Sequence, residues 1–427
     1  MDRIALHWQI LIAIALGCAF GYWVPNGVPY VSWMGDLFIR LLIMVVIPLV
    51  FCSIIAALTG IRGGEKLKRL GLKTVSFYLF TTLLAIFTGL FLVTLVQPGA
   101  GIDLSDEIDA PALQSKTLGE ALFACLPRNP FGDLAAGQML PIVVFAIIFG
   151  IFLARARNES DEQSLDLPDD SHTFSSRAAA SSVETLIHCF RAGFDVMMKM
   201  TIFILKFAPL GVFGLIATNI ARFSGEGGAF AQFGQGLGLH FLVVFLALLF
   251  HIAVTLSLCI WLFSGCNPWK HFRNMGAVLL TAFSTASSNG TLPLAMRDTV
   301  EKNGVSKETA GFVLPMGAAF NMNGTALYEC AVVLFVAQAY GIELSLYQQV
   351  IMVLMVLITA IGTAGIPMAS LVMIVIVLNA VGLPPEGIGL VIAVDRALDM
   401  CRSAVNIYGD TCCAIIVAKS EGETLNV

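Results

Sequence analysis

Apolar runs of about 20 residues recur along this chain, and a run of that length is what a helix needs to cross a bilayer. The runs lie near residues 4–24, 33–59, 74–97, 138–154, 195–221, 237–264, 310–340 and 386–418. Of the 427 residues, 57% are hydrophobic and only 12% are charged, which is far from the make-up of a soluble domain. Because a helix satisfies its own backbone polar groups within lipid, we expect an all-α polytopic membrane protein.

Two further apolar stretches, near residues 274–296 and 347–382, are interrupted by Gly, Pro, Ser and Thr. We therefore predict eight full transmembrane helices plus two broken segments. The first apolar run is too long for a secretory signal and lacks a cleavage pattern, so we expect it to be retained as a span.

The distribution of Lys and Arg over the short loops predicts the orientation. Loop 61–73 (IRGGEKLKRLGLK) is strongly basic, whereas segment 98–137 carries several acids among few cations. We expect the basic loop in the cytoplasm, the acidic segment outside and both termini inside. The polar stretch 157–177 has the composition of a flexible cytoplasmic loop.

Several classes of function find no support in the sequence. The ten cysteines are scattered without a C-x-x-C pair and the six histidines are dispersed, so neither a disulfide framework nor a metal site of these residues is indicated. We find no phosphate-binding glycine pattern, nucleophile triad or nucleic-acid patch. We expect a protein that is not an enzyme and that binds no nucleic acid.

The two broken segments are similar in composition. AFSTASSNGTLPLAMRD (282–298) and AIGTAGIPMASLVM (360–373) both place small and polar residues in an apolar setting, and a long helix follows each. Broken helices at corresponding places in two halves are typical of transporters built from inverted repeats, in which each segment enters the membrane, turns and leaves. Free backbone groups at the turn can then face a solute or an ion. The alternative is a pair of kinked spans whose small residues allow close packing.

The last apolar run contains a polar stripe. At 100° per residue, the polar side chains of VIAVDRALDMCRSAVNIYGD (391–410) occupy one arc of roughly 100°. They are Asp395, Asp399, Arg402, Ser403, Asn406 and Asp410. A charge near the bilayer centre costs about 2.5–3.5 kcal/mol even on a lenient scale, so we expect the stripe to line a cavity within the protein. An Asp–Arg network that only locks helices together is the alternative, and Arg396 is expected to point away as a bystander.

Side-chain chemistry suggests a role for each member of the stripe. Arg402 offers a planar fork for a carboxylate, and Asp399 can accept an ammonium group. Asn406 and Ser403 can hydrogen-bond a second carboxylate. Asp410 is a hard oxygen ligand of the kind that a small cation needs.

A second polar cluster, NMNGTALYE (321–329), lies in the middle of the apolar run 310–340. Polar groups are expensive at this depth unless the helix unwinds. An unwound helix lets Asn321 turn a backbone oxygen toward a cation and lets Thr325 face a solute.

The motifs SSNGTLP (287–293), NMNGTALYE (321–329), GTAGIP (362–367) and DRALDMCRSAVNIYGD (395–410) resemble those of the glutamate/aspartate transporter family, the dicarboxylate/amino acid:cation symporters, in its bacterial type. The resemblance covers nearly the whole chain. It implies eight transmembrane helices and two re-entrant helical hairpins arranged as inverted repeats. It also implies an elevator-type movement, a homotrimer in the lipid bilayer and a multi-pass place in the cell inner (cytoplasmic) membrane.

The resemblance further implies a division into a scaffold and a transport domain. Residues 1–70 would form scaffold helices 1 and 2, and residues 71–100 would form helix 3 of the transport domain. Residues 101–225 would hold an extracellular segment and scaffold helices 4 and 5. Residues 226–427 would form the transport-domain core of helix 6, hairpin 1, helix 7, hairpin 2 and helix 8.

Carried over position by position, the family's substrate site falls on both hairpins and the last two helices. Its expected members are Ser287, Ser288, Thr325, the backbone from Ile366 to Ser370, Asp399, Arg402, Ser403 and Asn406. The expected Na⁺ ligands fall on three sites. They are Gly317, Asn321, Asn406 and Asp410 for site 1, Ala319, Ala360, Ile361 and Thr363 for site 2, and Tyr78, Thr81, Thr82 and Asn323 for site 3.

The sequence departs from the family pattern in several places. Asn323 replaces the usual Asp, which removes a negative charge and predicts a weakened or empty third cation site. Ser403 stands where Thr is common, Ala286 stands where Arg is often found, and GIPMAS (365–370) replaces a glycine-rich run. Glu329 stands where proton-coupled relatives carry Glu, so it is our candidate for the carrier of a cotransported proton. A mere hydrogen bond from Glu329 to a neighbouring helix is the alternative.

The leading hypothesis is import of an acidic amino acid, glutamate or aspartate, coupled to Na⁺ and, through Glu329, to H⁺. Close alternatives are a C4-dicarboxylate symporter and a neutral amino acid symporter. Arg402 argues against neutral substrates, and Asp399 favours an amino group. An ion channel is the alternative from another class, but broken-helix symmetry suits alternating access better than a fixed pore.

Overall fold

The computed structural model describes residues 6–59, 65–102, 104, 127, 129–136, 139–165, 174–223, 229–362 and 369–427. Every regular element within these ranges is helical, and none of the described residues forms a strand. The expected all-α fold class is therefore confirmed. The chain divides into two compact units, Met1–Ile43 with Leu72–Ser115 and Ile204–Val427, and Met44–Gly71 with Lys116–Phe203.

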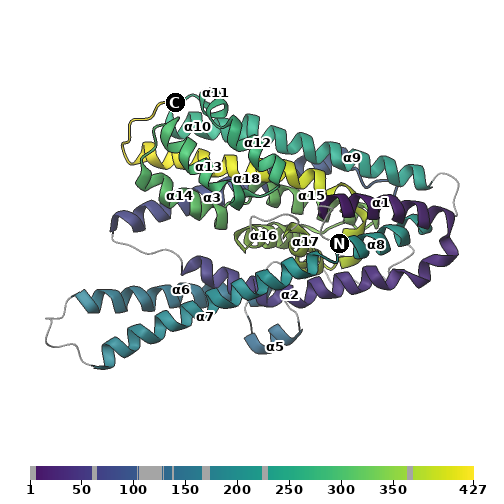
Figure 1. Ribbon diagram of the computed structural model, residues 1–427, viewed down its shortest axis with the longest axis horizontal. Coiled ribbons are helices and arrows are strands. Elements are labelled where there is room, and N and C mark those ends of the chain that lie inside the picture. Colours follow the sequence, from purple (N-terminus) through teal and green to yellow (C-terminus); the bar gives the residue numbers. More distant parts are fainter. Residues whose placement is uncertain are drawn as a thin grey trace. The chain divides into compact units, whose positions relative to one another are not determined.

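The first unit holds most of the helices. Those that lie wholly within it are α1 (Leu6–Trp23), η1 (Pro25–Tyr30), α8 (Ala208–Phe223), α9 (Ala229–Phe250), the π-helical η3 (His251–Leu256), α10 (Ser257–Ser264), α11 (Pro268–Asn274), α12 (Gly276–Thr285), α13 (Ser288–Glu301), α14 (Lys307–Phe320), α15 (Asn323–Ala339), α16 (Leu346–Gly362), α17 (Ala369–Val381), η4 (Pro385–Leu390) and α18 (Ile392–Ser420). Helix α18 packs against α9, α10, α12, α13, α14 and α15, and α1 lies beside α8 (Figure 1). Helix α18 therefore forms the centre of this unit.

The second unit holds α5 (Pro130–Ala136) and α6 (Met139–Leu165). Three helices, α2 (Ser32–Leu58), α3 (Glu65–Val96) and α7 (Phe174–Leu205), contribute to both units. In the second unit Phe51 and Phe190 bring α2 and α7 together, with ring centroids 5.9 Å apart. The carbonyl of Thr59 accepts hydrogen bonds from Arg157 and Arg191, so the C-terminal end of α2 is capped by cations.

Helix α6 corrects one expectation. The stretch 157–177 was expected to be a flexible loop, but α6 continues through it to Leu165 and α7 begins at Phe174. The residues of the α6 extension are polar, yet Arg, Glu and Gln among them have good helix propensity. Composition alone therefore misplaced the end of the helix.

Four helical stretches are long and apolar enough to cross a membrane, within the described ranges. They are Ser32–Ala56, Arg69–Val96, Ala231–Ser264 and Lys307–Ala339, and a fifth candidate is the pair Ser182–Ile204 and Ala208–Thr218, bent by 57°. Shorter apolar helices occur at Ile12–Trp23, Gly276–Thr285, Leu346–Ile361 and Ser370–Val381. These lengths support a multi-pass membrane protein, and the layout of eight spans and two hairpins remains a prediction.

The first broken segment is divided as the sequence indicated. In the first, α12 ends at Thr285, Ala286 adopts a left-handed conformation (φ 50°), and α13 begins at Ser288 and packs against α12. In the second, α16 and α17 pack against each other on either side of residues 363–368, which lie outside the described residues.

The NMNGTALYE cluster also breaks its helix, as predicted. Helix α14 ends at Phe320 and α15 begins at Asn323, while Asn321 (ψ 81°) and Met322 (ψ 54°) have non-helical backbones. The break frees backbone groups within one candidate span, Lys307–Ala339, and brings polar side chains to its middle.

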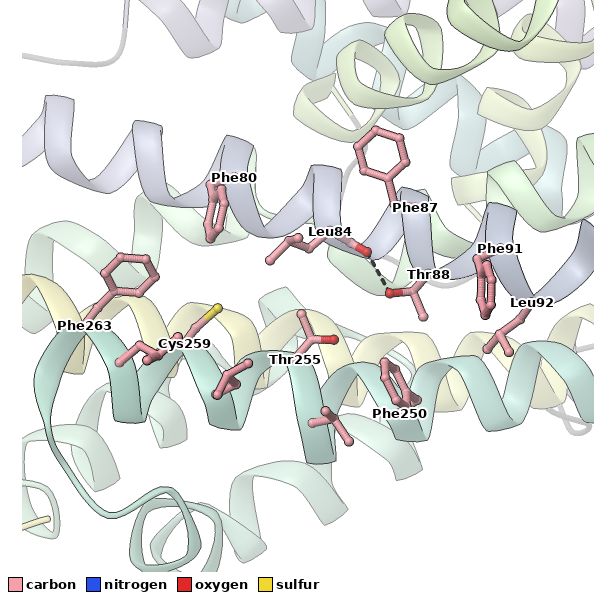
Figure 2. A pocket seen from close by; sticks show the side chains of 13 residues that line it. Phe80, Leu84, Phe87, Thr88, Phe91, Leu92, Phe250, Thr255, Cys259 and Phe263 are labelled. Atoms are coloured by element: carbon pink, nitrogen blue, oxygen red, sulfur yellow. Dashed lines mark hydrogen bonds between the residues drawn. The ribbon is translucent and has the colours of Figure 1, made fainter. Parts of the chain in front are cut away.

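A cavity of about 590 Å³ lies between α3 and the continuous stretch α9–η3–α10 (Figure 2). Its wall is built mainly from phenylalanines and leucines, including Phe80, Phe91 and Phe250. The hydroxyl of Thr88 donates to the Leu84 carbonyl at 2.7 Å, so it is satisfied within its own helix. The described residues that line this cavity include no charged group, so an acidic solute would gain nothing there.

Candidate functional site

The polar stripe of α18 is buried, as the sequence predicted. Asp395 and Asp410 expose 0% of their surface, Arg402 exposes 1% and Asn406 exposes 4%. Helix α18 is surrounded by other helices of its unit, so these groups face protein. Their burial is costly unless they are paired or bind something.

Arg402 is the centre of the first cluster. Its Nη2 lies 2.9 Å from Asp399 Oδ1 and 3.1 Å from Asp395 Oδ1. Its guanidinium carbon lies 3.9 Å from the centroid of the Tyr328 ring, a cation–π contact from α15. Two of its nitrogens, Nε and Nη1, have no hydrogen-bond partner among the described residues. The guanidinium is therefore held firmly on one side and keeps donors for another group.

Arg396 is not the bystander that the sequence suggested. Its Nη1 lies 3.4 Å from Asp399 Oδ2, and its side chain exposes only 18% of its surface. At 100° per residue Arg396 falls about 20° beyond Ser403, at the edge of the stripe and not opposite to it. A long side chain covers that angle easily.

Asn406 joins α18 to the start of α15. Its Oδ1 accepts from the Gly324 backbone N–H at 2.8 Å, and its Nδ2 donates to Thr325 Oγ1 at 3.1 Å. A Cβ at Gly324 would lie 2.8 Å from the carbonyl oxygen of Arg402, so only glycine allows this approach. Ser403 is buried on the same face of α18.

Asp410 belongs to a second cluster with α14 and α3. Asn321 Nδ2 donates to Asp410 Oδ1 at 2.7 Å, while Asn321 Oδ1 and Asp410 Oδ2 have no partner among the described residues. A Cβ at Gly317 would overlap the Asp410 carboxylate and lie 2.6 Å from the Tyr78 hydroxyl. Gly317 therefore allows these two oxygen-bearing side chains to reach the backbone of α14. Tyr78 itself donates to the Val313 carbonyl at 2.9 Å.

Asn323 is bonded to α3. Thr82 Oγ1 donates to Asn323 Oδ1 at 2.8 Å, and Asn323 Nδ2 has no partner among the described residues. The hydroxyl of Thr81 donates to the Phe77 carbonyl of its own helix at 3.1 Å. The amide at position 323 thus presents its oxygen to a hydroxyl donor.

The remaining predicted residues lie on the broken segments and near them. Ser287 caps α13 by accepting from the Gly290 N–H at 3.1 Å, and the adjacent Ser288 is buried. Ser370 is buried at the start of α17, and its hydroxyl has no partner among the described residues. Ala360 and Ile361 lie in the last turn of α16, and Ala319 lies in the last turn of α14. Ile366 and Thr363 lie outside the described residues.

Glu329 is fully buried in α15. Along the chain it follows Thr325 by about one helical turn and Asn321 by about two. Its Oε2 accepts from the Thr359 hydroxyl of α16 at 2.8 Å, and its Oε1 has no partner among the described residues. The hydrogen bond to a neighbouring helix is therefore present, and the carboxyl retains one oxygen that can hold a proton.

Sequence reasoning missed three contacts of the site. Tyr328 supports Arg402, Met322 Sδ lies 3.3 Å from Asn406 Nδ2, and Thr359 binds Glu329. Tyr328 and Met322 lie in the polar cluster 321–329 and could have been suspected from their position. No local signal identifies Thr359, because it comes from a helix 30 residues away.

The arrangement combines two kinds of chemistry. Around Arg402 there are cationic donors, carboxylates, an amide and hydroxyls, which suit a small molecule that carries both anionic and cationic groups. Around Asp410 there are a carboxylate, an amide oxygen and buried, non-helical backbone at the α14–α15 break, which suit a small hard cation.

Comparison with known proteins agrees with this chemistry. The model of the "Sodium:dicarboxylate symporter family" matches residues 6–420. The chain is 33% identical to the proton/glutamate-aspartate symporter of Escherichia coli (strain K12), over 98% of this chain and 93% of that protein. It is 34% identical to the proton/sodium-glutamate symport protein of Bacillus caldotenax, over 99% and 96%. It is 30% identical to a C4-dicarboxylate transport protein of Rhodospirillum rubrum, over 98% and 89%.

A family match over almost the whole chain fits the broken spans and the buried polar clusters described above. The family consists of transporters, so the protein moves a small molecule across a membrane and is not an enzyme. The chain belongs to the sodium:dicarboxylate symporter family.

Proposed function

We propose that the protein imports acidic amino acids, glutamate or aspartate, in symport with Na⁺ and H⁺. The observation that carries this proposal is the state of Arg402, which is buried and paired and still has two nitrogens without a partner among the described residues. A buried guanidinium with vacant donors favours an anionic ligand, because unsatisfied donors in a low-dielectric site are costly. The names of the glutamate and aspartate symporters among its relatives support the same substrate class.

In this proposal the substrate lies between α18, the start of α15 and the two broken segments. Arg402 binds the side-chain carboxylate and Asp399 binds the ammonium group. Ser287 and Ser288 on the first hairpin, Ser370 and the backbone near Ile366 on the second, and Thr325, Ser403 and Asn406 bind the remaining polar groups. The bond between Asn406 and Thr325 supports a joint role, because it fixes both side chains relative to α18.

We assign Na⁺ to oxygen groups around the break between α14 and α15. Asp410, together with the backbone oxygens of Gly317, Asn321 and Asn406, forms the first site. Asp410 Oδ2 and the side-chain Oδ1 of Asn321 have no partner among the described residues, which supports a cation in this neighbourhood. The second site uses backbone oxygens of Ala319, Ala360, Ile361 and Thr363.

The third cation site is weakened in this chain. It would consist of Tyr78, Thr81, Thr82 and Asn323, and Thr82 already donates to Asn323 Oδ1. Donation to that oxygen reduces its capacity as a ligand, and an amide lacks the charge that a dehydrated cation needs. We infer that fewer than three Na⁺ ions accompany each substrate and that Glu329 carries a proton instead.

The assembly and topology follow from the family resemblance. We propose a homotrimer in the inner membrane of the cell, with both termini in the cytoplasm. Residues 1–70 and the helical part of 101–225 form the scaffold, and residues 71–100 and 226–427 form the transport domain that moves as an elevator.

Uptake into proteoliposomes tests the proposal. The purified protein should accumulate labelled glutamate and aspartate when an inward Na⁺ gradient is imposed, and more so when the interior is alkaline. Serine should not be taken up, because it lacks the second carboxylate. Uptake of serine without glutamate or aspartate, or uptake that ignores both gradients, would refute it. Succinate is the fourth compound to be tested in this assay, because a C4-dicarboxylate transport protein is among the relatives.

A further inference from the structure

Two guanidinium groups lie against Asp399, one at each carboxylate oxygen. Arg402 Nη2 lies 2.9 Å from Oδ1, and Arg396 Nη1 lies 3.4 Å from Oδ2. Both cations come from α18 itself, one turn on either side of Asp399, so the cluster is prebuilt in a single helix. Nothing in the proposed function above uses Arg396.

The two contacts differ in strength. Arg402 exposes 1% of its side chain, also binds Asp395 and stacks on Tyr328, so it has several reasons to stay in place. Arg396 exposes 18% of its side chain, and its contact with Asp399 is longer. A partly exposed ion pair of this length is weaker and can be exchanged for another. Arg396 is therefore the partner of Asp399 that an incoming cation can replace.

This exchange affects one class of substrate and not the other. The ammonium group of an amino acid must approach a carboxylate oxygen of Asp399, and Arg396 already occupies the neighbourhood of Oδ2 with the same charge. A dicarboxylate without an amino group brings no cation to this place. It gains from a second positive charge close to the site, because opposite charges attract strongly where water is scarce.

We propose that Arg396 determines specificity by acting as the exchangeable counter-ion of Asp399. It disfavours amino-substituted diacids and favours unsubstituted ones, and the ammonium group of the substrate displaces it. This inference rests on the proposed substrate site, in which Asp399 receives the ammonium group.

The test compares the binding of two ligands by the purified full-length protein. Aspartate and succinate differ chiefly in the amino group, and their Kd values are measured by titration calorimetry at one fixed Na⁺ concentration and pH. The variants are Arg396→Gln, which keeps much of the length and loses the charge, and Arg396→Lys, which keeps the charge. Arg273→Ala, a change at an exposed arginine of α11, is the matched control.

In Arg396→Gln we expect aspartate to bind more tightly and succinate more weakly, so that the ratio of their Kd values moves by about tenfold, the effect of roughly 1.4 kcal/mol. Arg396→Lys should restore most of the wild-type ratio, and Arg273→Ala should leave it unchanged. Opposite shifts for the two ligands cannot arise from damage to the fold, which weakens both.

A Kd ratio that stays within about twofold of wild type, less than 0.5 kcal/mol, overturns the inference. A parallel loss of affinity for both ligands overturns it as well. Both outcomes leave the proposed function intact. If Arg396→Gln does not fold, Arg396→Met, which also keeps much of the length and loses the charge, decides by the same criterion. A wild-type protein that binds neither ligand refutes the proposed function and this inference together.

Discussion

In the first unit, helices α1 and α8 pack closely against each other, and so do helices α15 and α18. The two contacts have different roles. In the α1–α8 contact a Cβ at Gly21 would lie 2.5 Å from the carbonyl oxygen of Ala217. In the α15–α18 contact a Cβ at Gly324 would lie 2.8 Å from the carbonyl oxygen of Arg402. Glycine allows the backbones to approach in both places, as in many membrane helix pairs.

The difference lies in what the approach brings together. Near Gly17 and Gly21 the α1–α8 contact buries apolar side chains such as Ile216 and Ile220. The α15–α18 contact buries Arg402 and Asn406, and it leaves two nitrogens of Arg402 without a partner among the described residues. Polar burial in a membrane is costly, so the second contact makes sense as a site and the first as a structural joint. Changes at the two places should therefore have separable effects.

The largest effect is expected at Arg402. In the proposed site Arg402 pairs with the substrate carboxylate, and truncating one partner of such a buried pair costs about 3–5 kcal/mol of binding free energy. Arg402→Cys should therefore reduce uptake of labelled glutamate and aspartate by at least about 100-fold, since each 1.4 kcal/mol is a factor of ten. Arg402→Lys keeps the charge without the planar fork and should recover only part of the activity. Undiminished uptake in Arg402→Cys would contradict the assignment of the substrate to the contact between α15 and α18.

The next largest effect is expected at Asp410. Asp410→Asn keeps an oxygen that can accept from Asn321 and removes only the negative charge, so the local fold should survive. The Na⁺ concentration for half-maximal uptake should rise about tenfold or more, which corresponds to roughly 1.4 kcal/mol. The response is measured as uptake against external Na⁺ at fixed aspartate. An unchanged Na⁺ curve would mean that the second polar cluster is only a structural network.

Much of this site could be predicted because its signals are local. The stripe of α18 follows from helical spacing within 20 residues, and the break at Asn321 and Met322 follows from polar residues inside an apolar run. The expected turn before Ser288 follows from a short run of small polar residues. In each case the cost of polar groups in lipid made the pattern informative.

What the sequence did not predict depends on side-chain reach and on packing between distant helices. The contact of Arg396 with Asp399 needs a long side chain to bend over the edge of the stripe, and an arc drawn from backbone angles misses it. The support of Arg402 by Tyr328 and the bond of Thr359 to Glu329 require α15, α16 and α18 to be placed in space first. Spacing within one helix carries no such information.

A smaller effect is expected at Glu329, on the same helix as the substrate contact. If this buried carboxyl carries a proton, Glu329→Gln should flatten the dependence of uptake on pH while leaving a slower, Na⁺-driven uptake. Thr359→Val removes the hydroxyl that binds Glu329 Oε2 and keeps the carboxyl, so its pH dependence should persist. Initial rates of aspartate uptake between about pH 5 and 9, a range that reaches the highest values documented for buried carboxyl groups, provide the measurement. Equal pH profiles for wild type and Glu329→Gln would show that Glu329 only joins α15 to α16.

The smallest effect on transport is expected in the α1–α8 contact, where the change should act on stability alone. Gly21→Ala places a methyl group against the Ala217 carbonyl, and overpacking of this kind costs about 1–3 kcal/mol. The melting temperature in detergent should fall, and the Kd for aspartate should stay within about twofold of wild type, a change of less than 0.5 kcal/mol.

Gly234→Ala in α9 is the matched control, because a Cβ there meets nothing within 4 Å among the described residues. In a helix interior that change is neutral or stabilising by up to about 1 kcal/mol. A loss of aspartate affinity in Gly21→Ala as large as its loss of stability would break the separation between the two contacts, because it would mean that α1 and α8 set the geometry of the α15–α18 site.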